Sequence, residues 1–418
     1  MKIFIETLGC KVNTYESEVI KEEFLRNGYE LADNLSDANV IVVNTCSVTN
    51  QSDAKSRKVI RNARKNNKNA ILVVCGCSSQ NHQEELKDLG ADILIGNKDK
   101  SKIFDYVNNY DNKQIFNYYN MFNTDFEKMS LDNYNDRTRA FVKIQDGCNN
   151  YCSYCIIPYL RGTIRNKDLN DAIDEINTLV NNGFKEIVLT GIHTGSYPEL
   201  VKLIHEISKN DKLERIRISS IEATEINDEF LKELNNNKKI CNHMHIPVQA
   251  ACDNTLKKMN RKYDMNKYKE IINKIREVRP DINITTDLIV GFPTETEEDF
   301  LESYNNAKEI KFGKIHVFPY SKRDGTVAAK MKSVVDDIEK KERTHKMIEL
   351  SNKLENEYYT KFIGKTLSVL IEEVFDKYCT GHTDNYIKVI INKKLEHNKF
   401  YNVKIIKVDN CNVYGEVE

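Results

Sequence analysis

Three cysteines in the stretch "DGCNNYCSYC" have a spacing that suits a cofactor. Cys148, Cys152 and Cys155 form a Cys-x3-Cys-x2-Cys pattern, and three thiolates on one compact loop can hold three irons of a [4Fe–4S] cluster. No His or Cys follows within twenty residues to supply a fourth ligand, whereas a structural zinc site needs four protein ligands. The pattern therefore favours an iron–sulfur cluster with one iron open to a further ligand, and zinc is the alternative.

Three more cysteines end predicted strands. The strands "KIFIETLGC", "ANVIVVNTC" and "AILVVCGC" finish at Cys10, Cys46 and Cys77. The carboxyl ends of parallel strands lie along one edge of a sheet, and open α/β sheets bind ligands there. We therefore predict that these three thiols gather at that edge. Cys75 lies two residues before Cys77, still within its strand, so we predict that Cys77 is functional and that Cys75 packs beside it.

The order of strands and helices predicts an α/β fold in several parts. Residues 1–110 alternate apolar strands with amphipathic helices, which predicts an open parallel α/β sheet, and residues 111–136 show no clean period and are predicted to be a linker. Residues 137–355 hold six strand candidates separated by helical stretches, which predicts a partial (β/α)6 barrel. Residues 356–418 hold short β-like runs between turn residues, which predicts a small antiparallel β-barrel.

Composition narrows the class of protein. The chain has 418 residues, of which 40% are hydrophobic and 30% charged, as in a soluble globular protein. No run approaches the roughly 18 apolar residues of a membrane helix, so we predict a cytoplasmic protein with no membrane partner. Its eleven cysteines are then no disulfide framework, because the cytosol keeps thiols reduced. The net charge of −1 means that local patches must hold any nucleic acid.

Several polar residues at or after the predicted barrel strands could bind a cofactor. The carboxyl ends of the strands form the mouth at which such barrels carry out chemistry. A solvated or simply buried strand-end residue is the alternative for each, and a carboxylate buried there needs a partner. The candidates are Thr190, Glu222, Gln249 and Asp287.

Two groups of arginines could bind anions. Arg161 and Arg165 lie just past the cysteine loop, where they could hold an RNA phosphate or a cofactor carboxylate, or form structural ion pairs. The helical stretch "QSDAKSRKVIRNARKNNK" places Arg57, Arg61 and Arg64 on one face. This face could contact RNA phosphates, or it could simply be solvated.

Motifs along the whole chain resemble one enzyme family. The cysteine loop after the first barrel strand resembles the radical S-adenosylmethionine superfamily, and Tyr154 matches the aromatic residue usual beside its last cysteine. The chain also contains "CSYCIIPYLRG", "RISSIE", "HMHIPVQ", "TDLIVGFPTETEEDF" and "FPYSKRDGT". Together these motifs resemble the methylthiotransferases. The last segment, with "GHTDNYIKV", resembles the TRAM domain, an RNA-binding barrel in which Tyr386, Phe400 and Tyr401 could stack on bases or pack in the core.

The resemblance implies a specific chemistry. Cys10, Cys46 and Cys77 would hold a second [4Fe–4S] cluster that carries the sulfur, and the first cluster would bind S-adenosylmethionine and cleave it to a radical. The substrate would be tRNA, methylthiolated at C2 of the adenine next to the anticodon. The resemblance also implies an electron donor such as flavodoxin or ferredoxin. It implies that Tyr154 is one of the cofactor-binding residues.

The stretch "ETLGCKVNTYES" resembles the branch that acts on N6-threonylcarbamoyladenosine. Branches that act on N6-isopentenyladenosine or on a ribosomal-protein aspartate are the alternatives within the family. Outside it, the alternative is a non-enzymatic iron–sulfur RNA-binding protein, which the missing fourth cysteine disfavours.

Overall fold

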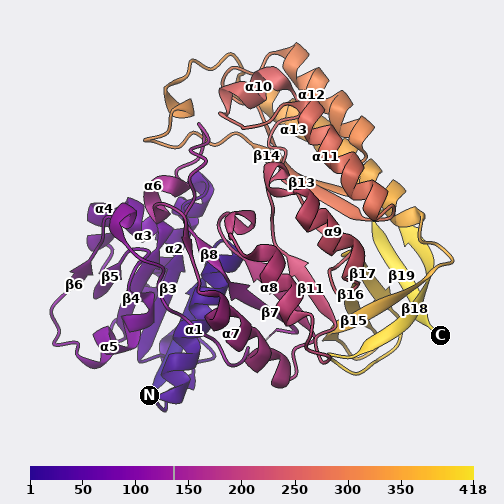
Figure 1. Cartoon of the computed structure of the whole chain (residues 1–418). Helices are drawn as coiled ribbons and strands as arrows, with labels where there is room; N and C mark the ends of the chain where they lie inside the picture. The colour runs from indigo at the N-terminus through magenta and orange to yellow at the C-terminus, as the bar shows by residue number, and fades with distance from the viewer. Residues whose placement is uncertain (135–136) are drawn as a thin grey trace.

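The N-terminal part of the chain is an open parallel sheet with helices on both faces (Figure 1). The computed structural model describes residues 1–134 and 137–418. The central strand β3 is buried at every residue, as expected for an apolar strand covered on both sides. The strand order is β2-β1-β3-β4-β5-β6. The strands are β1 Lys2–Thr7, β2 Glu30–Leu31, β3 Val40–Thr45, β4 Ile71–Gly76, β5 Ile93–Ile95 and β6 Ile115–Asn117. The helices are α1 Lys11–Arg26, α2 Asn50–Asn66, α3 Cys77–Asn81, α4 Gln83–Lys87 and α5 Ile103–Asn108.

Strand β6 extends this sheet past the predicted domain boundary at residue 110. It pairs in parallel with β5, so the predicted linker 111–136 contributes the edge of the sheet. Three residues are too few to show the alternation of a strand in the sequence. Residues 115–117 form a strand because their backbone pairs with β5. Residues 135 and 136 of the predicted linker lie outside the described residues.

The middle part forms the predicted open barrel. Two three-stranded parallel sheets, β11-β10-β7 and β12-β13-β14, are joined by a parallel bridge between Ile216 and Ile240. Their strands are β7 Arg139–Lys143, β10 Glu186–Thr190, β11 Arg215–Ile218, β12 His243–His245, β13 Asn283–Val290 and β14 Lys314–Pro319. A short antiparallel pairing joins β8 Gln145–Asp146 to β9 Arg165–Asn166, on either side of the cysteine loop and α6. The helices are α6 Ile157–Arg161, α7 Leu169–Asn181, α8 Leu200–Ile207, α9 Asp228–Asn236, α10 Asp253–Lys258, α11 Met265–Val278, α12 Glu297–Ile310 and α13 Asp337–Thr360.

A closed five-stranded barrel ends the chain and confirms the predicted fold class. Its order is β15-β16-β17-β19-β18, the pairing of β15 with β18 closes it, and all pairs are antiparallel except β17 with β19. The strands are β15 Thr366–Val374, β16 Cys379–Thr383, β17 Lys388–Ile391, β18 Phe400–Asp409 and β19 Asn412–Val417. In Figure 1 this barrel packs at the foot of α13, beside the open barrel. Among the described residues, no helix is long and apolar enough to span a membrane.

Candidate metal centres and substrate cavity

The three cysteines at the ends of the N-terminal strands come together near the start of α1. Cys10 caps α1, Cys46 follows β3 and Cys77 begins α3. Gly9 lies directly against Cys46, because a Cβ at Gly9 would be 2.7 Å from the Cβ and Sγ of Cys46. Burial raises the pKa of Cys46 to about 11, and the charges of Cys77 and Cys10 add to this rise. The three thiols therefore lie within electrostatic reach of one another.

A turn at Gly76 separates Cys75 from Cys77. Cys75 is opposite Asn44 in the sheet and is fully buried in the core on one face. Gly76 adopts φ +97°, and a Cβ there would lie 2.5 Å from the carbonyl oxygen of Thr45. The turn therefore requires glycine. Cys77 leaves the strand at this turn, toward the other two thiols, while Cys75 stays among apolar side chains.

The second group of cysteines lies on the loop between β8 and α6. The amide N–H of Asn150 donates to Cys148 Sγ at 3.5 Å, and Arg261 Nη1 donates to Cys152 Sγ at 3.4 Å. Burial raises the pKa of Cys155 to about 12, with a further rise from Cys152 and Cys148. N–H donors to sulfur stabilise thiolates and tune iron–sulfur centres. These donors fit a loop that carries a charged cluster.

The arrangement of both groups fits a cluster better than a single ion. Among the described residues, no three His, Cys, Asp or Glu side chains converge on a point where one metal ion would sit. Each cysteine group nevertheless brings three thiols near one another. Thiolates are the preferred ligands of a [4Fe–4S] cluster, and three of them leave one iron open, whereas a structural zinc site needs four protein ligands.

A cavity of about 360 Å³ adjoins the second group of cysteines and contains most of the predicted cofactor-binding residues. Its wall includes Cys148, Cys152, Cys155, Tyr154, Glu222, Gln249 and Asp287. Val48 and Thr49, from the loop after Cys46, line the same cavity. The loop of one cysteine group therefore faces the cavity that holds the other group.

Thr190 does not line this cavity. Its side chain is buried, and its hydroxyl donates to the carbonyl of Val188 within β10. Its position at the end of a strand predicted a side chain at the mouth of the barrel, but the hydroxyl is hydrogen-bonded to the backbone of its own strand. Thr190 therefore has no surface to offer a cofactor in this arrangement.

Two further residues, Arg261 and His193, lie at this site, and of these only Arg261 lies outside the strand ends at which the sequence predicts the barrel mouth. Arg261 forms an ion pair with Glu222 as well as its hydrogen bond to Cys152. His193 lies 3.8 Å from Cys148 Sγ and 2.6 Å from Glu225. Arg261 lies in a loop with no motif, so only the fold brings it to the cysteines. His193 follows a strand end, and that position was a usable signal.

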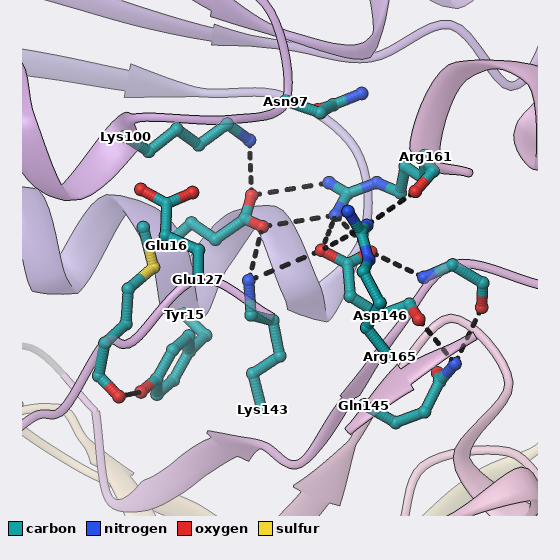
Figure 2. A network of polar contacts seen from close by, with 12 residues as sticks. Tyr15, Glu16, Asn97, Lys100, Glu127, Lys143, Gln145, Asp146, Arg161 and Arg165 are labelled. Carbon is teal, nitrogen blue, oxygen red and sulfur yellow. Dashed lines mark hydrogen bonds and ion pairs between the residues drawn. The ribbon is translucent and has the colours of Figure 1, made fainter. Parts of the chain in front are cut away.

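Arg161 is buried between the N-terminal sheet and the open barrel rather than exposed to RNA (Figure 2). Its Nη1 donates to Glu16 at 3.1 Å and to Asp146 at 3.0 Å, and its Nε donates to Cys77 Sγ at 3.4 Å. Arg165 is also buried, and its Nη2 lies 3.8 Å from Asp146. The predicted contact of both arginines with an RNA phosphate is therefore wrong, because neither side chain is accessible. Their structural ion-pair alternative is what the fold contains.

Glu16 is the centre of this buried network. Besides Arg161, it pairs with Lys100 and, at 2.9 Å, with Lys143. Burial alone would raise the pKa of Glu16, but the charges of Arg161, Lys100 and Lys143 lower it well below its usual range. Glu16 lies on α1, while Lys143 and Arg161 belong to the open barrel. The network therefore joins the two cysteine-bearing parts of the chain.

The arginines of α2 are only partly free. Arg57 pairs with Glu85 at 3.3 Å, and Arg64 pairs with Asp92. Arg61 is exposed and has no ion pair among the residues the structure describes. A role of this helix in RNA binding stays a prediction, and Arg61 is the side chain best placed for it.

A second, larger cavity of about 1270 Å³ lies between the strands of the open barrel and the C-terminal barrel. It shares Asp287 and Phe318 with the small cavity, and it reaches Gly9 and Lys11 beside Cys10. Tyr386 of the C-terminal barrel lines its far side. The aromatic residues predicted for that barrel divide accordingly: Tyr386 faces a cavity, Tyr401 packs against the barrel core, and Phe400 lies under the guanidinium of Arg215.

Curated relatives cover almost the whole chain. Residues 142–307 match the Radical SAM superfamily, and residues 2–96 match the family described as "Uncharacterized protein family UPF0004". The chain is 43% identical to threonylcarbamoyladenosine tRNA methylthiotransferase MtaB of Bacillus subtilis, over 97% of this chain and 94% of that protein. It is 37% identical to MtaB of Thermotoga maritima, over 92% and 90%. Its identity to tRNA-2-methylthio-N6-dimethylallyladenosine synthase of a Thermoanaerobacter species is 35%, over 99% and 92%.

Solved structures agree on the fold. The radical S-adenosylmethionine methyltransferase TsrM of Kitasatospora setae superposes with a TM-score of 0.58 at 14% identity, over 76% of this chain and 72% of that one. The chain belongs to the family of radical S-adenosylmethionine methylthiotransferases, in the branch of the MtaB-type enzymes.

Proposed function

We propose that this protein inserts a methylthio group at C2 of N6-threonylcarbamoyladenosine next to the anticodon of tRNA. One observation carries the proposal: Cys148, Cys152 and Cys155 line the small cavity, and Val48 and Thr49, from the loop after Cys46, line the same cavity. Relatives that are 43% and 37% identical are named for the threonylcarbamoyladenosine substrate. A relative that is 35% identical is named for dimethylallyladenosine, which is the second candidate.

As a member of this family, the protein uses S-adenosylmethionine and two [4Fe–4S] clusters. Cys148, Cys152 and Cys155 would hold the cluster that binds S-adenosylmethionine. The second cluster would be held by Cys10, Cys46 and Cys77. When bound, these groups supply the radical that activates the adenine C–H bond and the sulfur that is inserted.

The wall of the small cavity supplies polar partners for S-adenosylmethionine. Asp287 and Glu222 are carboxylates on this wall, and their charge complements a ligand that carries an ammonium and a sulfonium. Arg261 forms an ion pair with Glu222, and His245 lies 3.3 Å from Asp287, so both carboxylates are held in place. Gln249 adds an amide on the same wall. Binding by these residues stays a proposal, as does the role of Tyr154.

Apolar side chains complete the wall and limit the entry of water. They are Val48, Ile156, Ile157, Ile192, Ile289 and Tyr320. A water-poor site strengthens electrostatic contacts and prevents side reactions of reactive species. The chain therefore contributes a shaped, largely apolar chamber with a few placed charges.

The remaining parts of the proposal concern partners. The exposed Arg61 on α2 and the C-terminal barrel are the surfaces we assign to tRNA, because phosphate contacts dominate RNA affinity. A flavodoxin or ferredoxin would supply the electron. The protein would work in the cytoplasm, where its tRNA substrate is found.

Mass spectrometry of tRNA nucleosides tests the proposed substrate. Deletion of the gene should remove 2-methylthio-threonylcarbamoyladenosine, and the wild-type gene on a plasmid should restore it. A plasmid with Cys148→Ala, Cys152→Ala and Cys155→Ala should not. Loss of 2-methylthio-isopentenyladenosine, or of the methylthio group on a ribosomal-protein aspartate, would instead assign the chain to another branch. If the purified holoenzyme fails to cleave S-adenosylmethionine under reducing conditions, the non-enzymatic alternative is correct.

A further inference from the structure

The strands of the open barrel place polar side chains on the inner face of the large cavity. Successive residues of a strand point to opposite faces, and the cavity is lined by alternate residues such as Asn283, Thr285 and Asp287 of β13. Across the whole lining, five Lys or Arg residues face three Asp or Glu residues. A hollow with this balance suits an anionic ligand better than an apolar one.

The positive charge of this cavity is concentrated around Tyr386. The guanidinium groups of Arg139 and Arg217 lie 5.3 and 4.6 Å from the centre of its ring. Burial alone would raise the pKa of Tyr386, but the charges of Arg139, Lys11 and Arg217 outweigh it and lower the pKa. Three cations, one from the N-terminal part and two from the open barrel, therefore act on one hydroxyl group. We call Lys11, Arg139, Arg217 and Tyr386 the cationic end of the cavity.

The charges at the cationic end are held in place but incompletely satisfied. Glu372 pairs with Arg139 at 3.2 Å, and Glu186 pairs with Arg217 at 2.7 Å, so both guanidinium groups are fixed. Arg217 is 3% exposed, yet its Nη2 has no hydrogen-bond partner among the described residues. Lys11 is exposed and, within the same residues, forms no ion pair. A buried donor without a partner is costly, and an uncompensated ammonium beside it attracts an anion.

The cationic end is continuous with the reactive region. Lys11 follows Cys10 directly in the chain, and Asp287 and Phe318 belong to both cavities. An adenine bound in the small cavity would therefore lie next to the large cavity. The threonylcarbamoyl group ends in a carboxylate, whereas a dimethylallyl group has no charge.

We propose that the cationic end of the large cavity binds the carboxylate of the threonylcarbamoyl group and so selects this substrate. The inference rests on the proposed function and adds the residues that read the modification. Lys and Arg donate strong charge-assisted hydrogen bonds to carboxylates. An uncharged N6 substituent would leave these donors without a partner, which opposes its binding.

Binding of modified RNA to the reconstituted holoenzyme tests this inference. Three anticodon stem-loops are compared by fluorescence anisotropy: one with threonylcarbamoyladenosine, one with its threoninamide analogue and one with adenosine. The wild type should bind the carboxylate form about tenfold more tightly than the amide, the effect of one charge-assisted contact. Lys11→Gln should abolish most of this preference and leave the affinity for the other two RNAs unchanged. Lys11→Arg should retain it.

Tyr386→Phe is the second variant, because it removes only a hydroxyl and keeps the ring between the two guanidinium groups. It should reduce the preference about threefold. Iron content equal to wild type is required of each variant.

Two outcomes would overturn the inference. Equal binding of carboxylate and amide by the wild type would mean that the carboxylate is not read. An equal loss of affinity for all three RNAs in Lys11→Gln would mean that this end contacts a backbone phosphate. Failure of the proposed function looks different, because the wild type would then leave threonylcarbamoyladenosine in tRNA without a methylthio group, whatever the binding preference.

Discussion

Replacing Glu16 by glutamine removes a carboxylate that binds three buried cations at the junction of the two cysteine-bearing parts. Lys100 would keep only a hydrogen bond to Asn44 at 3.3 Å. Lys143 and Arg161 would share Asp146, at 3.5 and 3.0 Å. Figure 2 shows how these side chains converge on Glu16. The change keeps the shape of the side chain, removes its charge and replaces one acceptor oxygen by an NH2 donor.

The expected cost follows from burial. Lys100, Arg161 and Glu16 are all within 1% of complete burial. Removing one partner of such a pair costs roughly 3–5 kcal/mol, because the remaining charge stays buried without compensation. That is a large part of a typical stability of about 5–15 kcal/mol. It corresponds to a fall in Tm on the order of 10 °C for a part of this size.

Calorimetry and urea unfolding of the metal-free protein measure this cost. Glu23→Gln is the matched control, because it removes a carboxylate from the same helix at a partly exposed position that has no ion pair in the part of the chain that the structure describes. It should change stability by less than about 0.5 kcal/mol. Adding Lys100→Met to Glu16→Gln should restore part of the loss by removing one stranded cation.

The pH dependence gives an independent check. The folded protein lowers the pKa of Glu16, so its ionised form stabilises the fold above the unfolded pKa of about 4.3. This stabilisation is lost as the pH falls below that value, and Glu16→Gln should remove that part of the acid sensitivity. A loss below about 1 kcal/mol at neutral pH, or an equal loss in Glu23→Gln, would refute the reasoning.

Three further predictions concern the cysteines, the domain contact and the RNA surface. Cys75→Ala should retain about eight irons per chain after anaerobic reconstitution and Cys77→Ala about four, because only Cys77 leaves the strand toward the other thiols; the reverse result would contradict the strand register. Burial opposes ionisation of Asp53, but His82 and Arg323 lower its pKa to about 2. The 2.6 Å ion pair with Arg323 should therefore stabilise the protein above about pH 4, and this stabilisation should be lost as the pH falls toward 2. In urea unfolding, Asp53→Asn should lack this dependence on pH. Arg61→Ala should reduce the salt dependence of tRNA binding, measured as the slope of log K against log salt concentration, by the amount expected for about one phosphate contact. An unchanged slope would mean that α2 does not bind the RNA.

Much of the fold was predictable because its signals are local. Apolar strands, amphipathic helices and the turns between them indicate parallel β/α units wherever they occur, and the run of motifs identified the family. The edge strand Ile115–Asn117 was missed, since three residues have no period of their own and are a strand only through their partner β5.

The candidate site divides in the same way. The cysteines could be recognised from spacing and from strand ends, because ligand chemistry depends on residue type. Arg261 could not, since it reaches Cys152 from a loop 109 residues away in the chain. Arg161 and Arg165 were misassigned to RNA because a charged residue in a sequence does not reveal whether it is buried.

By itself, the sequence determined the chemical class: six thiols in two groups, a parallel α/β framework and a small C-terminal barrel. Only the tertiary structure decided which charges are paired and which are left to bind a ligand. Glu16, Arg161 and Asp146 form a closed network, whereas Lys11 and the Nη2 of Arg217 lack partners among the described residues. The physical reason is that pairing and burial depend on distances between residues far apart in the chain, and local patterns of residue type do not contain those distances.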